Sequence, residues 1–252
     1  MNLFDLTGKY ALVTGGSRGL GLGMAEGLAQ AGASVVIVGS NDKVLGVAEQ
    51  MQKDGLKVQG LKWDLAERDS LPGLMDTALA MMSGRIDILV TAAGTQIRRP
   101  STDFPLEDWD TVINVNLTSV FALNQLAGRR MIEQGGGKIV NVASLLSYFG
   151  GITVPAYAAS KGGIAQITKA LSNEWASKNV QVNAIAPGYM DTDMCSALVA
   201  DPVRSKEILA RIPAGRWGLG EDMKGACVFL ASAASGYVSG VIIPVDGGYL
   251  GR

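Results

Sequence analysis

The 252-residue sequence contains no histidine, so it lacks the side chain that Ser-His-Asp hydrolysis and most zinc sites require. It also has no excess of basic charge, because 22 Lys and Arg are balanced by 23 Asp and Glu. Nucleic acids and anionic membrane surfaces attract proteins through surplus positive charge, and we therefore expect neither as a partner. The composition argues against a hydrolase, and we expect no metal centre.

Cysteine and long apolar runs are scarce as well. Cys195 and Cys227 do not form a CxxC pair, and the first residues show no apolar run of the signal-peptide type. No apolar stretch reaches the ~18 residues that a membrane span needs. We expect a protein of the reducing cytoplasm. The two cysteines and the four tryptophans are expected to be packing residues.

Charged residues make up only 18% of the chain and hydrophobic residues 48%, which indicates extensive burial. No linker or charge block divides the sequence, so residues 1–252 are expected to form one domain. Short apolar runs rich in β-branched residues alternate with segments of helical periodicity, which is typical of a parallel sheet covered on both faces by helices. The sequence predicts an α/β, doubly wound sheet of seven strands in three layers. The runs are Tyr10–Gly15, Ser34–Gly39, Lys57–Trp63, Ile86–Ala92, Lys138–Ser144, Val180–Pro187 and Gly240–Gly248.

Ligands of such sheets bind beyond the carboxyl ends of the strands, and the first loop there is rich in glycine. The segment "TGGSRGLGLG" separates the first strand from a helix expected to run to about Ala31. Gly15, Gly19 and Gly21 permit a tight turn and bring backbone N–H groups close to an anion. An ordinary glycine-rich turn is the alternative, but a strand before the loop and a helix after it favour dinucleotide binding.

Tyr157 and Lys161 are the candidate acid–base pair in a chain without histidine. They lie four residues apart on an expected helix, so they share one face. An ammonium close to a phenol favours the phenolate, and we expect it to lower the tyrosine pKa from about 10 toward the working pH. Taken singly, each residue is equally compatible with an ordinary helix surface.

TGxxxGxG near the start and YxxxK about 140 residues later resemble the short-chain dehydrogenase/reductase family, over essentially the whole chain. The resemblance implies a Rossmann fold and hydride transfer between a nicotinamide dinucleotide and a carbonyl or alcohol. It implies that Tyr157 exchanges the proton and that Ser144, thirteen residues earlier, binds the substrate oxygen. Lys161 would lower the Tyr157 pKa and hold the cofactor ribose, and Asn116 would anchor a water leading to Lys161.

The resemblance also implies the cofactor site. An acidic residue at the end of the second strand normally binds the ribose of NAD, but Gly39 and Ser40 stand there in this chain. Arg18 could reach a 2′-phosphate, so we expect NADP(H) to be favoured, with NAD(H) and a contact from Asp42 as the alternative. The expected cofactor contacts are Gly15, Ser17, Arg18, Gly19, Leu20, Gly21, Ser40, Asn41, Asp64, Leu65, Ala93, Gly94, Tyr157, Lys161, Pro187, Gly188, Met190 and Thr192.

One motif departs from the family pattern. The fourth strand is usually followed by Asn-Asn-Ala-Gly, whereas residues 91–94 read "TAAG". Both amides are missing, so the hydrogen bonds that they make at the centre of the sheet must be replaced or lost. We expect any effect to fall on stability and cofactor affinity.

The segments "RSKEILARIPAGRWG" and "VDGGYLGR" resemble sugar-acid dehydrogenases of the same family. A sugar acid needs a cation for its carboxylate, and Arg98 is the expected ligand, beside Ser144 and Tyr157, while Arg99 faces solvent. A polyol dehydrogenase, a reductase of carrier-bound 3-oxoacyl groups and a non-catalytic dinucleotide sensor are the alternatives. The resemblance implies a homotetramer.

Overall fold

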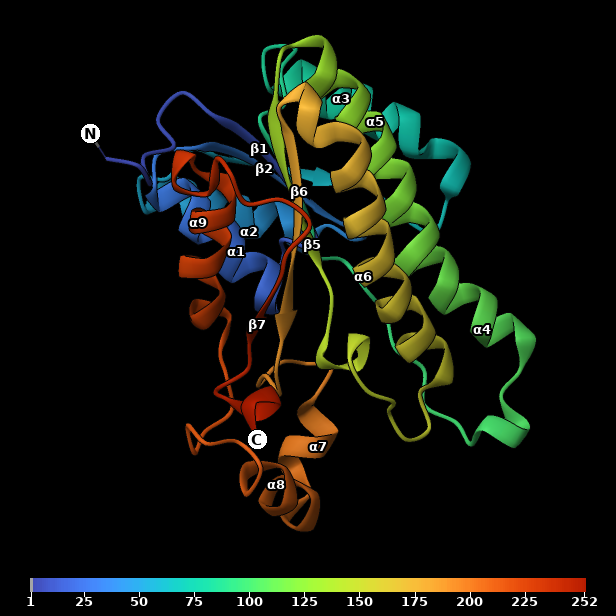
Figure 1. Cartoon of the computed structure of the whole chain (residues 1–252). Coiled ribbons are helices and arrows are strands. Elements are labelled where there is room, and N and C mark those ends of the chain that lie inside the picture. Colours follow the sequence, from blue (N-terminus) through green and yellow to red (C-terminus); the bar gives the residue numbers. More distant parts are fainter. Residues whose placement is uncertain (1) are drawn as a thin grey trace.

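The seven strands form one parallel sheet with the order β3-β2-β1-β4-β5-β6-β7 (Figure 1). The computed structural model describes residues 2–252. The strands follow one another outward from the centre in both directions, from β1 to β3 on one side and from β4 to β7 on the other. The connections after β1 and β4 therefore lead to opposite sides, which leaves space between them at the carboxyl edge of the sheet. This confirms the predicted doubly wound sheet. The strands are β1 Tyr10–Thr14, β2 Ser34–Gly39, β3 Val58–Lys62, β4 Ile88–Thr91, β5 Gly137–Val142, β6 Val180–Pro187 and β7 Ile242–Val245.

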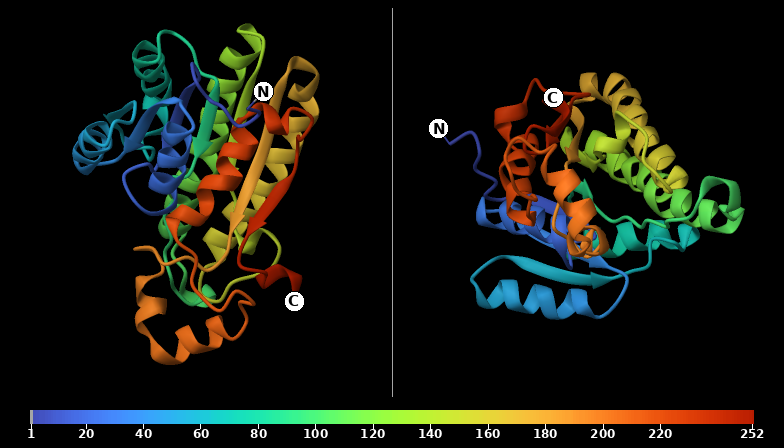
Figure 2. Two further views of the ribbon diagram at one scale, coloured as in Figure 1. Left: turned by 90° about the vertical axis from the view of Figure 1, so that its left-hand side faces the viewer. Right: turned by 90° about the horizontal axis from the view of Figure 1, so that it is seen from below.

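Helices cover both faces of the sheet. α1, α2 and α9 pack on one face, and α3, α5 and α6 pack on the other (Figures 1 and 2). Within residues 2–252, no helix combines the length and the apolar character needed to cross a membrane. The helices are α1 Gly19–Gln30, α2 Lys43–Lys53, α3 Leu71–Met81, α4 Leu106–Ile113, α5 Ser119–Glu133, α6 Pro155–Trp175, α7 Ser196–Ala200, α8 Pro202–Leu209 and α9 Lys224–Ala231.

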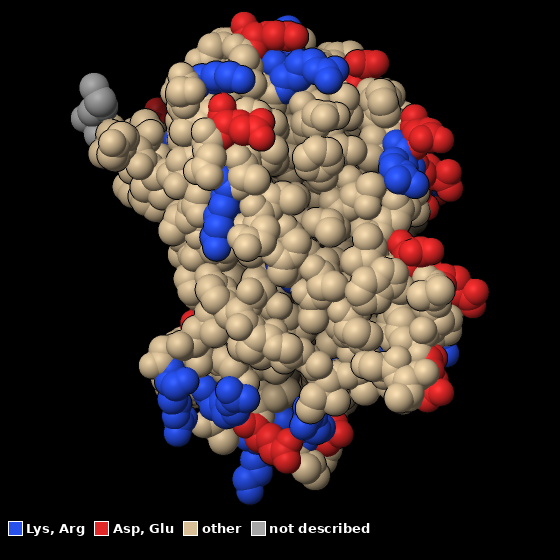
Figure 3. Space-filling view, turned by 45° about the vertical axis from the view of Figure 1, so that its right-hand side comes forward, with Lys and Arg blue, Asp and Glu red and all other residues tan. Residues whose placement is uncertain are grey.

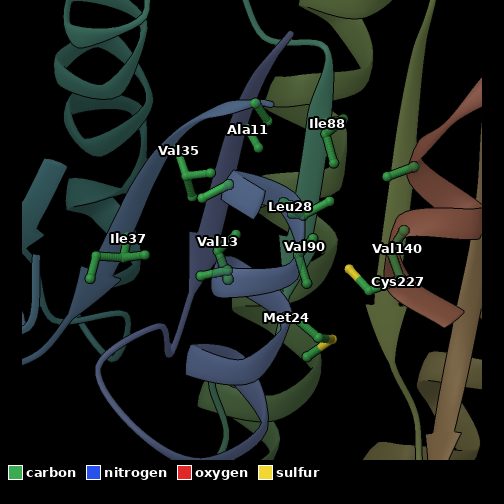
Figure 4. Close-up of a cluster of buried hydrophobic side chains, with 14 of the residues drawn as sticks. Ala11, Val13, Met24, Leu28, Val35, Ile37, Ile88, Val90, Val140 and Cys227 are labelled. Carbon is green, nitrogen blue, oxygen red and sulfur yellow. The ribbon is translucent and has the colours of Figure 1, made fainter. Parts of the chain in front are cut away.

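Strand β1 shows how the strands separate two cores. Ala11 and Val13 point toward α1 and lie in the cluster drawn in Figure 4. Leu12, between them, points to the opposite face and packs with α3 and α5. All three side chains are fully buried. Because both faces are covered, successive residues Ala11, Leu12 and Val13 are all apolar, which is why the sequence shows no alternation there.

The carboxyl edge carries a small structure of its own. α7 and α8 lie beyond the ends of the strands, close to the C-terminus (Figure 2). Ile208 and Ile212 pack there against Leu145, which follows β5, and against Tyr249 near the end of the chain. This cluster joins the segment after β6 to the loop after β5, so two walls of the carboxyl edge are held by apolar contact.

A buried polar network at the sheet centre replaces part of what the missing amides would supply. Thr91 Oγ1 donates to Asn141 Oδ1 at 2.8 Å, which links β4 to β5. Asn141 Nδ2 donates to Thr168 Oγ1 on α6, and Asn124 Nδ2 of α5 donates to Asn141 Oδ1. Asn124 Oδ1 finds no donor among residues 2–252. At residues 91–92 the Thr91 hydroxyl therefore joins the central network, in which one buried acceptor, Asn124 Oδ1, has no donor among residues 2–252.

We expect Thr91→Val to lower the free energy of unfolding by about 1–2 kcal/mol, because it removes a buried donor at nearly constant volume. Thr77→Val on the exposed face of α3 is the matched control, since it loses only a bond to its own helix at Gly73. Urea denaturation at constant slope measures both variants. An equal change in the two variants would show that the central network adds no stability.

Candidate active site

A cleft lies beyond the carboxyl ends of the central strands and brings together most of the residues expected from the sequence. It passes from the glycine loop and β2, across the loop after β4, to Tyr157 and the segment after β6. Eighteen of the expected cofactor and catalytic positions line it. They are Gly15, Ser17, Arg18, Gly19, Leu20, Gly21, Ser40, Asp64, Leu65, Ala93, Gly94, Ser144, Tyr157, Lys161, Pro187 and Gly188, and Met190 and Thr192 line it as well.

The glycine loop has the conformation that an anion-binding loop needs. Gly15 has a φ of +69°, in the left-handed region that favours glycine. A Cβ at Gly21 would stand 2.2 Å from the carbonyl oxygen of Gly15, so this position must also lack a side chain. α1 begins at Gly19 and directs its N-terminal N–H groups toward the cleft. The loop is therefore suited to a pyrophosphate.

At the β2 end, the cleft differs from the expected set at two positions. Asn41 is not among the lining residues, and its Oδ1 accepts instead from the backbone N–H of Lys43, where α2 begins. Trp63 does line the cleft, although its sequence suggested only packing. The carboxylate of Asp42, the alternative contact for the cofactor ribose, forms an ion pair with Lys62 at 3.0 Å. Ser40 is left as the polar side chain at the end of β2.

Tyr157 and Ser144 form the polar centre of the other half of the cleft. Ser144 Oγ accepts from the backbone N–H of Leu146 at 3.1 Å, so its own proton is free to be donated. Burial raises the pKa of Tyr157 to about 12, while a hydrogen bond with Ser144 and the charge of Arg98 act in the opposite direction. The expected lowering of the pKa by Lys161 is wrong for this structure, in which desolvation of the phenol is the largest effect.

Lys161 is itself buried, with 5% of its surface exposed. Its Nζ donates to the carbonyl oxygen of Val142 at the end of β5, at 2.6 Å, and lies 5.7 Å from the centre of the Tyr157 ring. Burial lowers the pKa of Lys161 to about 8. The amine therefore reaches the cleft next to Tyr157. Because it is shielded from solvent, its protonated form is less stable than that of an exposed lysine.

Asn116 lies beneath the cleft rather than in its lining. The residue is fully buried in a π-helical turn, Asn114–Thr118, that joins α4 to α5. Its side chain accepts from Thr95 N and donates to Thr95 O, both at 2.8 Å, and also donates to Ser160 Oγ. The amide thus holds the loop after β4 against α6, in a position that sequence spacing alone does not reveal.

The segment after β6 adds two residues that the sequence did not single out. Asp193 Oδ2 accepts from Arg18 Nη1 at 2.8 Å, so a residue of this segment is paired with the glycine loop across the cleft. Cys195 also lines the cleft, and its charge state influences the pKa of Tyr157. The packing role expected for Cys195 is wrong, whereas Cys227 is fully buried in the core cluster of α9.

The two neighbouring arginines have different surroundings. Arg99 pairs with Asp108 of α4, and its backbone N–H donates to Thr153 O. Arg98 is exposed and donates only to Gln96 Oε1 among residues 2–252. Burial raises the pKa of both Tyr157 and Cys195, and the charge of Arg98 acts in the opposite direction on each, although Arg98 does not line the cleft. Arg98 therefore remains free to pair with an anion.

Together these features fit a dinucleotide and a small carbonyl or alcohol. The glycine loop presents backbone N–H groups at the start of α1, Ser40 and Asp64 line the groove beside it, and Tyr157 and Ser144 bring two hydroxyls into the other half of the cleft. Such a site can hold a hydride carrier against a carbon whose oxygen is simultaneously protonated.

Comparison with known proteins gives one family model and several full-length relatives. The family model described as short chain dehydrogenase matches residues 9–202. The 2-dehydro-3-deoxy-D-gluconate 5-dehydrogenase of Escherichia coli strain K12 is 51% identical, and the match covers 100% of this chain and 99% of that protein.

Two solved structures extend the comparison. One, from Agrobacterium tumefaciens, is provisionally named a 2-deoxy-D-gluconate 3-dehydrogenase and has NADP bound; it is 47% identical with a TM-score of 0.93, and the match covers 100% of each chain. The other is a gluconate 5-dehydrogenase from Burkholderia cenocepacia in complex with NADP and tartrate. It is 41% identical with a TM-score of 0.95, and the match covers 100% of this chain and 98% of that one.

We expect Lys161→Met to raise the free energy of unfolding at pH 7 by about 1–3 kcal/mol, because an amine that is costly to bury is replaced by an apolar chain of similar length. Folding lowers the Lys161 pKa from 10.5 to about 8. The cost of the charge is therefore complete below pH 8 and disappears as the pH rises through 10.5, so the gain should shrink over that range.

Thermal unfolding between pH 7 and pH 10.5 measures this gain. Lys169→Met, at an exposed position of the same helix, is the control and should change stability little at any pH. A loss of stability in Lys161→Met at pH 7 would contradict the prediction and would mean that the bond to Val142 outweighs the cost of burial.

Proposed function

The chain belongs to the short-chain dehydrogenase family, and we propose that it interconverts a ketone and a secondary alcohol on a sugar acid, with a nicotinamide dinucleotide as hydride carrier. The observation that carries the choice of substrate is Arg98, a guanidinium near Tyr157 that has no carboxylate partner within residues 2–252. The names of the three relatives support it, since each refers to an acid of the gluconate type. Within this class, we propose compounds related to 2-dehydro-3-deoxy-D-gluconate or 2-deoxy-D-gluconate as the preferred substrates, ahead of gluconate itself.

The proposed mechanism assigns proton transfer to Tyr157. When bound, the dinucleotide supplies or accepts the hydride. Burial raises the pKa of Tyr157 to about 12, so the phenol holds its proton at neutral pH, the state that reduction of a carbonyl requires. Ser144 donates to the same substrate oxygen and stabilises the charge that develops there. Lys161 lies next to Tyr157, where its amine would hold the ribose and favour the return of the proton in the oxidation direction.

Both halves of the cleft run along one sheet, and we infer that cofactor and substrate bind within a single domain, residues 1–252. The residues proposed to act on the substrate oxygen come from the loop after β5 and from α6, whereas those for the adenosine come from β2 and the loop after β3. Cys195 and Cys227 are free thiols, which suits the reducing cytoplasm that we propose as the location.

A substrate panel tests the proposal. Oxidation of 2-deoxy-D-gluconate and D-gluconate, and reduction of 2-dehydro-3-deoxy-D-gluconate, would be followed through nicotinamide absorbance with each cofactor. Neutral polyols and acetoacetyl-CoA represent the polyol dehydrogenase and the 3-oxoacyl reductase, and Tyr157→Phe serves as the inactive control. Turnover of an acid in preference to every neutral compound is expected. Preference for acetoacetyl-CoA would overturn the proposed substrate, and no turnover together with dinucleotide binding would favour a sensor.

We expect Arg98→Ala to lower kcat/KM on acidic substrates by about 10- to 100-fold, because a charge-assisted hydrogen bond contributes about 1.5–3 kcal/mol. Arg99→Ala is the matched control, since Arg99 is already paired with Asp108 and should affect acidic and neutral substrates alike. Steady-state kinetics on an acid and on its uncharged counterpart measure the difference. An equal loss on both substrates in Arg98→Ala would mean that Arg98 only shapes its loop.

We propose NADP(H) as the preferred cofactor. Ser40 stands where an acidic residue would repel a 2′-phosphate, and the nearby Asp42 has Lys62 as its ion-pair partner. Arg18 lies at the same end of the cleft, and its present partner is one exposed carboxylate, that of Asp193. A phosphate carries more charge than a carboxylate and would compete well for the guanidinium.

In Arg18→Ala we expect the dissociation constant of NADPH to rise about tenfold and that of NADH to change less than threefold, because only the former offers a 2′-phosphate. Asp193→Asn removes the competing carboxylate and should tighten NADPH slightly. Fluorescence titration with NADPH and NADH measures these constants for both variants and for the unmodified protein without any turnover. Tighter binding of NADH than of NADPH by the unmodified protein would refute the preference.

We also propose a homotetramer. The face formed by α4, α5 and α6 carries few charged side chains, which gather instead along its rims (Figure 3). Leu106 of α4 is 79% exposed and Phe121 of α5 is 42% exposed, as expected for side chains that a second copy would cover. Light scattering at micromolar protein should give four times the chain mass, and a mass equal to one chain would exclude the assembly.

A further inference from the structure

We infer that Ser147 is a positioning residue that holds Ser144 in register with Tyr157 and Lys161. Ser147 belongs to the segment "NVASLLS", does not line the cleft and is half-buried. The inference relies on the hydride-transfer reaction of the family and not on the identity of the sugar acid, so it extends the proposed function to a residue outside the cleft.

The side chain of Ser147 bridges two structural elements. Its Oγ accepts from the backbone N–H of Ser144 at 3.3 Å, at the start of a short 3-10 turn, Leu145–Ser147. The same oxygen donates to the carbonyl oxygen of Lys161 in α6 at 2.6 Å. One hydroxyl thus connects the backbone of the residue expected to bind substrate to the backbone of the residue expected to support the acid.

This bridge shortens a long connection through the chain. Residues 148–154 separate the turn from α6 and form no helix or strand. Thr153 within them has a φ of +63°, and the Ile152 side chain is 76% exposed. The covalent path alone therefore leaves the turn and the helix loosely related. The hydroxyl of Ser147 fixes them directly, 14 residues apart in sequence.

Fixing the turn also fixes the direction in which Ser144 donates. Ser144 Oγ accepts from Leu146 N within the same turn, so the orientation of its O–H depends on how the turn is held. Reacting groups must be placed to within about 0.5 Å, and a displacement of about 1 Å can reduce a rate about 100-fold. Loss of the bridge should therefore affect the chemical step and leave the distant pyrophosphate loop unchanged.

The test compares Ser147→Ala with the replacement of a serine at the far end of α6, the helix to which Ser147 is bonded. Ser172 Oγ shares a hydrogen bond with Ser239 Oγ at 2.7 Å, so Ser172→Ala removes a hydrogen bond of similar length away from the cleft. In Ser147→Ala we expect kcat to fall about 10- to 100-fold, with substrate KM and the dinucleotide dissociation constant within threefold of the unmodified protein. Ser172→Ala should retain kcat, and Ser147→Thr, which keeps the hydroxyl, should restore most of it.

A pH profile separates positioning from a general loss of structure. The hydrogen bond with Ser144 acts to lower the pKa of Tyr157, so a misplaced Ser144 should move the ionisation that limits kcat to higher pH. If Ser147→Ala does not fold, Ser147→Cys keeps a similar volume with a weaker donor and should show the same changes to a smaller extent.

The inference is overturned if kcat in Ser147→Ala stays within twofold, if Ser172→Ala loses as much, or if the pH profile is unmoved while kcat falls. The comparison uses any ketone or alcohol that the unmodified protein converts, whether or not it is a sugar acid. A failed substrate panel would therefore refute the proposed sugar-acid function without deciding the role of Ser147.

Discussion

The candidate site depends on the burial of one amine, that of Lys161, against the carbonyl oxygen of Val142. This bond attaches the second turn of α6 to the end of β5, and Tyr157 stands one turn earlier on the same helix. Burying the amine is costly, as the lowered pKa of Lys161 shows, and the surrounding packing has to supply the difference. Ser147 Oγ adds a bond to the carbonyl oxygen of Lys161, and Asn116 Nδ2 donates to Ser160 Oγ, so the start of α6 is held from two other segments.

Much of the fold and of the cleft could be predicted from the sequence, because parallel strands covered on both faces must be apolar at every position. The buried stretches Val35–Val38 of β2 and Ile88–Val90 of β4 appear in the sequence as uninterrupted apolar runs, and cleft residues follow each strand. Since parallel strands end at one edge, the glycine loop, Ser144 and Pro187 had to meet there. The spacing of Tyr157 and Lys161 placed them on one helix face, but it contains no information about depth of burial, so the direction of the Tyr157 pKa was predicted incorrectly.

What the sequence did not indicate are contacts between segments that share no local pattern. The bonds of Asn116 to the backbone of Thr95 depend on a π-helical turn that no motif announces. The sequence left open whether the hydrogen bonds of the missing amides are replaced or lost, and the Thr91 hydroxyl reaches Asn141 because β4 and β5 are neighbours in the sheet. Asn41 was expected to contact the cofactor, but its side chain accepts a hydrogen bond in the turn before α2 and does not line the cleft. Trp63 was expected only to pack, but it follows β3 directly and lines the cleft.

The pair of Arg18 and Asp193 spans the cleft between segments that are 175 residues apart, and both side chains are about two-thirds exposed. Two solvated charges can separate without exposing apolar surface. Separation of this ion pair should therefore involve little change in heat capacity and little cost in free energy. Ionic strength, which screens such a pair, would govern it more than temperature does. The two ends of the segment after β6 are thus held by different forces, which are apolar contact at Ile208 and a pair of solvated charges at Asp193.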